Sequence, residues 1–445
     1  MDPFNLLTLA SEFPTSLTWA YEGPCRIQHS NEHLEREINA TWTDSGIGML
    51  DDADRAIWNI GMRAEYGVRI PTITVAGSDG TWNTPWVHPF TRDEQRGHTK
   101  LLWREMWQRL STADTAATVI LFRDPPSVVF PDHLPVVKGV FGRSTGENGL
   151  RSRLFGREAL LRPTKIGDEP MLAVAYAGAP FGAEQSVSIL TVLSLVFGRD
   201  VEAVTELAVD VEGNSVSRHL YAARCTCKRE PRPALMCADA RTVSALGANL
   251  DRMVEAARRL RFDDDCPIDS AVITLLTCNS GRLDFEIRDI VLALDTVVQS
   301  RKFSPNEGRI VDNFAPIAEH MQAAIKTLPS DIPKALRQRL RERIAEANQT
   351  YLSARRKRFW DAVGFTPTAD EDKALLRRNP MSHKGFIDIA DLATERALFL
   401  DIRRARTLVN EALLALLGYD GPVPDYVEGP SRPIRAATEK KCSVP

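Results

Sequence analysis

The spacing of apolar residues changes once along this chain, near residues 227–237, and that change divides it into two parts. Before it, short runs rich in β-branched and aromatic residues, such as TAATVILF and MLAVAYAG, are bounded by Gly, Pro, Asn and Asp. After it, apolar residues recur every three to four positions. The sequence therefore predicts an α+β protein, with an N-terminal mainly β domain that contains a few helices, followed by an all-α helical bundle.

The expected domains follow from this division. Residues 1–228 form the mainly β domain, which we expect to bind or sense a ligand or trigger that the sequence does not identify. Residues 229–240, which combine prolines with a charge cluster, are the expected linker. Residues 241–420 form the helical domain, and residues 421–445, which contain five prolines, are expected to be a flexible tail.

Helices are predicted from three- and four-residue apolar spacing and from end signals. Two fall in the mainly β domain, at 98–110 and 184–198, the second ending at Gly198. Thr368 and Glu371 form a predicted capping box, and Gly418 is a predicted stop. The helices expected in the second domain are 241–262, 268–278, 283–301, 311–328, 331–362 (capped by Ser330, with Pro333 in its first turn), 369–378 and 392–417.

Composition excludes several classes of protein. The 56 Lys and Arg residues nearly balance 59 Asp and Glu residues, for a net charge of −3, which excludes a globally basic nucleic-acid binder. The longest apolar stretch, 189–197, is about half the ~20 residues that a membrane span requires. The N-terminal segment lacks the features of a signal peptide, so a cytoplasmic location is expected. Seven cysteines without framework spacing predict reduced thiols.

The segment LLRRNPMSHKG, residues 375–385, is the strongest candidate for chemistry. Asn379 is a favoured N-cap and Pro380 a favoured first helical residue, so a short helix is expected to begin there. Arg378 then lies just outside a helix N-terminus, where unpaired N–H groups and the helix dipole attract phosphate. His383 lies about one turn inside the helix. This arrangement predicts an anion site with an acid/base group attached.

These residue types suit RNA cleavage. The guanidinium of Arg378 can hold two phosphate oxygens, and His383 can deprotonate a 2′-hydroxyl or protonate the leaving 5′-oxygen. The chemistry requires no metal or cofactor, and the spacing of Cys225, Cys227 and Cys237 departs from that of zinc knuckles. An alternative reading remains open, in which Asn-Pro is only a helix boundary and His383 lies on a polar surface.

The arrangement around the motif resembles the HEPN domain, in particular its Apea-like group. The resemblance consists of Arg378-Asn379, three residues, His383 and Lys384-Gly385, then a long amphipathic helix and the closing LLALLGYDG. It covers roughly 241–418. The predicted helix at 283–303 is similar to the early helix of the family, which commonly carries an acidic residue in an alanine/leucine setting. That position is Asp295 here.

The resemblance implies a metal-independent endoribonuclease, often dimeric, of the kind found in toxin and antiphage-defence systems and here regulated by the N-terminal domain. Arg378 would grip the scissile phosphate, His383 would act as general acid/base, and Asn379 would cap the helix and orient the pair. Asp295 would support the site. Pro380 removes one backbone donor from the phosphate cradle. Attack by the 2′-oxygen would leave a 2′,3′-cyclic phosphate and a 5′-hydroxyl.

A basic segment is consistent with an RNA substrate. Between residues 334 and 358, nine basic residues stand against two glutamates. Concentrated positive charge on one element is typical of phosphate-backbone binding, although a solvated helix face has the same composition. Tyr351 and Trp360 flank the cluster and suit either base stacking or core packing. The residues expected to contact RNA are Arg355, Arg356, Lys357 and Arg358.

The number of histidines bears on assembly. Cleavage by 2′-oxygen attack uses a base and an acid, whereas the motif holds a single histidine, and His320 is the other histidine of the predicted bundle. A homodimer through the helical domain would supply both groups from two copies of the motif. A non-catalytic RNA- or nucleotide-binding or dimerisation protein is the alternative function.

Overall fold

The computed structural model divides the chain into two compact units, named here the sheet unit and the helical unit. The sheet unit comprises residues 1–186, 197–233 and 237–251, and the helical unit comprises residues 187–196, 234–236 and 252–445. The structure describes residues 19–29, 32–42, 48–51, 72–77, 80–84, 87–93, 98–103, 105–123, 149–166, 169–221, 234–235, 240–277, 283–303, 313–329, 331–347, 352–377 and 391–435.

The boundary between the units differs from the expected linker at 229–240. The amides of Ala234 and Leu235 donate to carbonyls in the last turn of α3 (Ala183–Phe197), and both side chains are buried. The division falls inside α4 (Ala240–Arg258), between residues 251 and 252. The prolines and charges of this segment predict a linker, but its apolar residues Ala234 and Leu235 are buried and bond to the end of α3.

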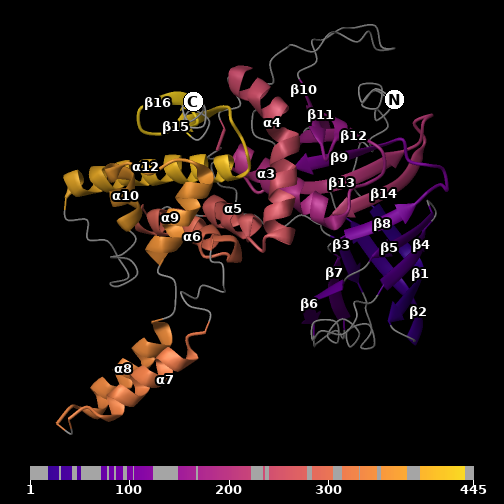
Figure 1. The fold of residues 1–445 in the computed structure, drawn as a ribbon. Coiled ribbons are helices and arrows are strands. Elements are labelled where there is room, and N and C mark those ends of the chain that lie inside the picture. Colours follow the sequence, from indigo (N-terminus) through magenta and orange to yellow (C-terminus); the bar gives the residue numbers. More distant parts are fainter. Residues whose placement is uncertain are drawn as a thin grey trace. The chain divides into compact units, whose positions relative to one another are not determined.

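The strands of the sheet unit form one sheet, which confirms the mainly β prediction. Every neighbouring pair in its described part is antiparallel, and the strands are drawn from indigo to magenta in Figure 1. Their order across the sheet is β10 (Leu150–Leu154), β11 (Arg157–Ile166), β12 (Glu169–Ala177), β9 (Ala117–Arg123), β13 (Glu202–Val209), β14 (Ser215–Tyr221), β8 (Glu105–Arg109), β5 (Gly80–Thr84), β4 (Thr72–Gly77), β1 (Trp19–His29), β2 (Glu32–Trp42), β3 (Gly48–Asp51), β7 (His98–Trp103) and β6 (Val87–Asp93).

Strand β9 lies between β12 and β13 and is buried on both faces. Val119 and Leu121 point to one face, where they cluster with Ala173 and Ala175 of β12. The intervening residues of β9 point to the other face and are buried as well. A continuous apolar run bounded by turn residues therefore marks an interior strand here, because neighbours cover both of its faces.

The helix predicted at 98–110 is wrong. The segment forms two strands, β7 and β8. In β8, Met106 and Gln108 are buried whereas Trp107 and Arg109 are exposed, which is the two-residue alternation of a strand. The apolar residues also fit a helical spacing, and pairing of β8 with β14 and β5 decides between the two. The helix predicted at 184–198 is confirmed as α3, and Gly198 follows it with a φ of +66°.

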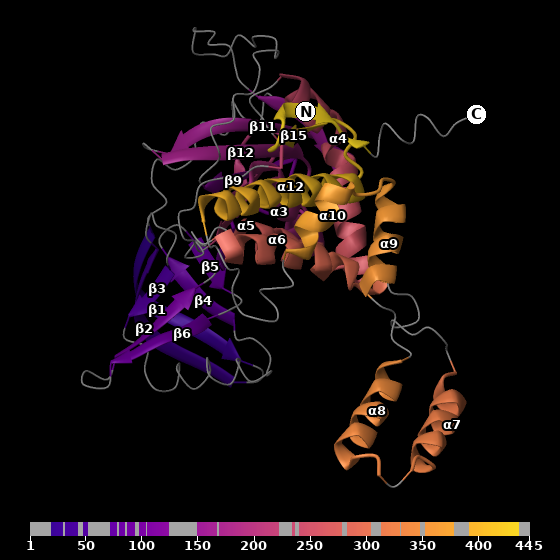
Figure 2. The same cartoon turned by 90° about the vertical axis from the view of Figure 1, so that its left-hand side faces the viewer.

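The helical unit confirms the predicted change to helical structure. Helix α6 packs against α5, α9 and α12, and α10 packs against α12; Figure 2 shows this group of helices from a second side. In the described part of the chain, no helix combines the length and the apolar character needed to cross a membrane. The helices are α4 with a π-helical turn at Arg259–Asp263, α5 (Ile268–Thr277), α6 (Leu283–Val298), α7 (Ala315–Lys326), α8 (Lys334–Glu346), α9 (Leu352–Val363), α10 (Ala369–Leu376) and α12 (Leu392–Leu416).

Two predictions within this unit are wrong. The single helix expected over 331–362 is two helices, α8 and α9, and Pro333 is the N-cap of α8 rather than a residue of its first turn. Ser330 lies outside the described residues. The flexible tail expected from residue 421 begins instead with a hairpin of β15 (Pro422–Asp425) and β16 (Gly429–Pro433), in which Val423 is buried.

The predicted capping box of α10 and the predicted glycine stop of α12 are confirmed. Thr368 and Glu371 form the predicted capping box of α10, and Gly418 has a φ of +81° directly after α12. Glycine is favoured there because residues with a Cβ rarely adopt positive φ. The side chain of Cys266, which precedes α5, is a buried free thiol. Burial raises the pKa of this thiol to about 11, so the thiol is protonated at neutral pH.

Candidate functional site around the α10–α12 connection

The predicted catalytic residues Arg378, Asn379 and His383 lie outside the described residues, as does Pro380. What the structure gives is the frame that holds the two ends of their segment. Helix α10 ends at Leu376 with Arg377 as its C-cap, and α12 begins at Leu392 with Asp391 as its N-cap. The motif therefore starts at the first residue after the C-cap of α10.

The start of α10 is held by its capping box. The Thr368 hydroxyl accepts from the Glu371 amide at 3.3 Å, and the Glu371 carboxylate accepts from the Thr368 amide at 2.7 Å. Each side chain satisfies a backbone donor that the first turn of the helix leaves without an intrahelical partner. The sequence signal predicted this contact, and the same glutamate makes a second contact that it did not predict.

The end of α10 is held on α12 by an ion pair. Arg377 Nε lies 2.7 Å from Asp401 Oδ2, and the Asp401 side chain is buried. Arg404 joins this group, because its guanidinium lies 3.0 Å from Asp370 of α10 and 3.6 Å from Asp401. A charged pair with a buried carboxylate is costly to separate, so the residue before Arg378 is fixed in position.

The start of α12 is also capped. The Asp391 carboxylate accepts from the Thr394 amide at 2.7 Å, and this hydrogen bond lowers the pKa of Asp391. Asp391 therefore stays ionised at neutral pH, where its charge also complements the positive end of the helix dipole. The predicted catalytic segment thus runs from a C-cap whose side chain pairs with Asp401 to an N-cap whose side chain accepts from a backbone amide.

Asp295, the predicted supporting residue, is fully buried in α6, and its partner is Arg356 of α9. Arg356 Nη2 and Nε lie 2.8 and 3.2 Å from Asp295 Oδ1. Burial lowers the pKa of Arg356, and the negative charge of Asp372 on α10 acts in the opposite direction. The two predicted site residues therefore meet each other, and this pair joins α6 to α9 and leaves Arg356 with an internal partner.

The other three basic residues predicted to contact RNA have different surroundings. Lys357 and Arg358 are exposed on α9, whereas Arg355 is half-buried. The aromatic pair that follows these residues on α9 lies in the core. Phe359 and Trp360 are buried, and their ring centroids are 4.9 Å apart. Trp360 therefore packs in the core rather than offering a surface for base stacking, while Tyr351 lies outside the described residues.

A second buried ion pair links α6 to α12. Arg406 Nη2 lies 3.1 Å from Glu286 Oε1, and both side chains are buried. Glu286 and Asp295 are thus two buried carboxylates of helix α6 that each face an arginine of a different neighbouring helix. These pairs hold the packing of the bundle in register, since an unpaired charge in either place would be strongly unfavourable.

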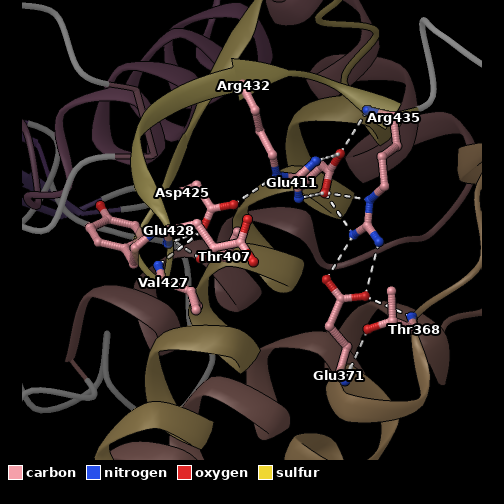
Figure 3. A network of polar contacts seen from close by, with 10 residues as sticks. Thr368, Glu371, Thr407, Glu411, Asp425, Val427, Glu428, Arg432 and Arg435 are labelled. Atoms are coloured by element: carbon pink, nitrogen blue, oxygen red, sulfur yellow. Dashed lines mark hydrogen bonds and ion pairs between the residues drawn. The ribbon is translucent and has the colours of Figure 1, made fainter.

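Sequence reasoning missed a polar network at the other end of α12 (Figure 3). Glu411 is fully buried and accepts from the guanidinium of Arg432 at 2.6 and 3.1 Å. It also accepts from the backbone amide, Nε and Nη2 of Arg435 at 2.7, 2.9 and 2.7 Å. Arg435 in turn pairs with Glu371 of α10 at 2.9 and 3.1 Å and lies over the ring of Phe365.

This network anchors residues 422–435 on α12. Burial by itself raises the pKa of Glu411, but the hydrogen bonds from Arg435 and Arg432 outweigh burial and bring that pKa below its ordinary value. The segment after α12 supplies both arginines, so it must fold back onto the helix. A signal was present in the sequence, namely a glutamate within the apolar stripe of α12 and two arginines three residues apart.

Comparison with protein-family models, with curated proteins and with solved structures gives no match to this chain. Among the described residues, no group of three or more His, Cys, Asp or Glu side chains is arranged to hold a metal ion.

Proposed function

We propose that the helical unit is a metal-independent endoribonuclease of the HEPN type that cleaves RNA by attack of the 2′-hydroxyl on the neighbouring phosphate. Arg378 holds the scissile phosphate, His383 transfers the proton, and Asn379 caps the helix that carries them. The observation that carries the proposal is the anchoring of Arg377 on Asp401 of α12, which gives the adjacent motif a fixed starting point.

The frame supports this role in a specific way. Catalysis by a positioned acid/base group requires the group to be held within hydrogen-bond reach of the reacting atoms. A motif that begins directly after a C-cap on a packed helix satisfies this requirement better than one in the middle of a free loop. The second point of support is the N-cap of Asp391 at the far end of the connection.

The test is cleavage of total RNA by the purified chain in the presence of a chelator. His383→Ala and Arg378→Ala are expected to lower the cleavage rate by about 10² to 10⁴, the usual contribution of a general acid/base group. Arg396→Ala is the matched control, because Arg396 is exposed on α12 outside the motif. Equal rates for His383→Ala and the parent chain would remove His383 from the site.

The RNA surface that we propose comprises the exposed Lys357 and Arg358 of α9, the half-buried Arg355 beside them and the basic residues of α8. Arg356 is excluded from this surface by its pairing with Asp295. Phosphate contacts of this type supply affinity without sequence preference. The scissile bond is then selected at the motif rather than at this surface.

The active form that we propose is a homodimer through the helical unit, so that two copies of the motif supply the acid and the base. Mixing inactive His383→Ala subunits with parent subunits is expected to depress activity more than simple dilution does. His320 is exposed on α7, and His320→Ala is expected to keep full activity. The dimer would be refuted if a monomer had full activity and His320→Ala abolished that activity. His320 would then be the second acid/base group.

The biological role that we propose is that of a cytoplasmic toxin or antiphage effector, controlled by the sheet unit. Expression of the parent chain is expected to arrest growth, and expression of the His383→Ala chain is not. The alternative is a non-catalytic RNA- or nucleotide-binding or dimerisation protein, favoured by the basic character of α8 and α9. RNA binding without cleavage in the chelator assay would favour this non-catalytic alternative over the ribonuclease.

A further inference from the structure

Five residues on five neighbouring strands form one row across a face of the sheet unit. Glu206 of β13 lies opposite His219 of β14, which lies opposite Trp107 of β8. Trp107 lies opposite Asn83 of β5, and Asn83 lies opposite Thr74 of β4. Directly opposed residues of antiparallel strands point to the same face. We name these five residues the cross-strand row.

The side chains of the row are ordered by contacts with one another and with Tyr221, two residues after His219. The Tyr221 hydroxyl lies 3.4 Å from Glu206 Oε2, and the ring of Tyr221 stacks on that of His219 with centroids 4.3 Å apart. At the other end, the Thr74 hydroxyl donates to Asn83 Oδ1 at 3.1 Å. The row therefore combines planar rings with polar groups held in fixed positions.

Exposure changes along the row. Glu206 is 5% exposed, whereas Trp107 is 41% exposed. Gln108, the next residue of β8, points to the opposite face and is buried. The exposed indole is therefore not explained by an edge or a loop, since it stands in the interior of a sheet whose other face is covered. Tryptophan is enriched at binding interfaces, because its ring combines a large apolar face with an N–H donor.

Positive charge lies beside the indole. Arg109 follows Trp107 by two residues on the same strand, so it points to the same face, and it is exposed. Its Nε donates to the Ser111 carbonyl at 3.0 Å, which orients the guanidinium. At the buried end, burial raises the pKa of Glu206, while the charge of His219 and the hydrogen bond of Tyr221 lower it.

We propose that the cross-strand row binds a nucleotide, with the base stacked on Trp107 between His219 and Asn83 and the phosphate held by Arg109. An exposed indole offers the flat surface on which bases stack, and the amide nitrogen of the neighbouring Asn83 offers a hydrogen bond to a base edge. A guanidinium next to that surface matches a phosphate. The ligand is a free nucleotide or one unit of a single-stranded RNA.

The test measures binding by calorimetry to the full chain carrying His383→Ala, which prevents cleavage of an RNA probe. The probes are AMP, GMP, CMP and UMP, the four nucleosides, glucose, and a six-residue oligouridylate. Trp107→Ala is expected to weaken nucleotide binding by about 5- to 150-fold, the usual effect of removing one stacked base contact. Trp107→Phe, which keeps an aromatic face, is expected to retain most of the affinity.

Two further variants separate the parts of the site. Arg109→Gln is expected to weaken the binding of nucleotides and not that of nucleosides, because only the former carry phosphate. Leu110→Ala is the control, since Leu110 is 43% exposed next to β8 and alternation points it away from the row. Circular dichroism and the melting temperature of each variant show whether its sheet unit is folded.

The outcomes distinguish the possible ligands. Binding of monophosphates identifies a free nucleotide as the ligand, and binding of the oligonucleotide alone identifies RNA. Absence of binding to every nucleotide probe at millimolar concentration, or binding of glucose in preference to nucleotides, overturns the proposal. So does nucleotide binding that a folded Trp107→Ala chain retains unchanged. The result does not depend on ribonuclease activity, because the assay uses the His383→Ala background.

Discussion

The guanidinium of Arg356 and the carboxylate of Asp295 form an ion pair of 2.8 Å, with the carboxylate fully buried in α6. The pair connects two positions for which the sequence predicts different roles, namely RNA binding for Arg356 and support of the catalytic site for Asp295. Because this ion pair lies in the core of the helical unit, Arg356 and Asp295 both contribute to the packing of α9 on α6.

Removal of either partner of this pair is expected to destabilise the helical unit. Asp295→Ala or Arg356→Met should cost about 3–5 kcal/mol in the free energy of unfolding, because each leaves the other charge buried without its partner. Urea denaturation measures this. The matched control is Lys357→Ala, next to Arg356 but exposed, with an expected change within about 0.5 kcal/mol. Equal stability of Arg356→Met and Lys357→Ala would contradict the assignment.

The stabilisation from Glu411 is expected to depend on pH. Its pKa is lower in the folded chain than its ordinary value of 4.5, so its contribution is fully present above the ordinary pKa. The contribution is lost as the pH falls through the lower folded pKa. Glu411→Gln should therefore reduce the free energy of unfolding strongly at pH 7, and the difference from the parent chain should shrink below about pH 4. A difference that is constant between pH 7 and pH 3.5 would be inconsistent with an ionised Glu411.

The pair Arg377–Asp401 is expected to affect catalysis through position, if the proposed ribonuclease is correct. Arg377→Ala and Asp401→Asn should lower kcat for RNA cleavage more than they raise KM, because they loosen the start of the motif without removing a phosphate contact. Arg377→Lys should restore part of kcat. Equal losses in RNA affinity and in rate would instead place Arg377 among the RNA contacts.

RNA binding is expected to weaken steeply with salt. Each phosphate contact contributes about 0.7 to the slope of log affinity against log salt for single strands. Replacing Lys357 or Arg358 by Gln should therefore reduce the steepness, leave the cleavage position unchanged and leave stability unaffected. Lys302→Gln is a charge-matched control whose partner is Asp264. An affinity that is flat between low and moderate salt would exclude α9 from the RNA surface.

Local sequence signals were sufficient for most of the helical unit. In helix α10, the side chains of Thr368 and Glu371 each accept a hydrogen bond from the backbone amide of the other residue. After helix α12, Gly418 supplies the positive φ that ends the helix. These contacts join residues a few positions apart, so their chemistry is legible in a single stretch of sequence. The same holds for the change from strand to helix, which depends on the period of apolar residues over each segment.

Other features depended on partners distant in the chain. Residues 98–110 have apolar residues that fit both a helix and two strands, and hydrogen bonding of β8 to β14 selected the strands. Residues 347–351, which separate α8 from α9, contain no proline or glycine to predict the end of a helix. The hairpin after residue 421 is anchored on α12 by the ion pairs of Glu411 with Arg432 of β16 and with Arg435, which follows it.

The candidate site shows the same division. The sequence by itself determined the change of fold class, the capping box of α10, the glycines that follow α3 and α12 and the RN-x3-H motif, since each is encoded by neighbouring residues. Only the tertiary structure decided that Asp295 and Arg356 neutralise each other, that Arg377 is anchored on Asp401, and that Trp107 stands exposed in a row of polar side chains. The physical reason is that burial and charge pairing are properties of elements brought together by folding, and a linear sequence does not specify which distant side chains will share one low-dielectric environment.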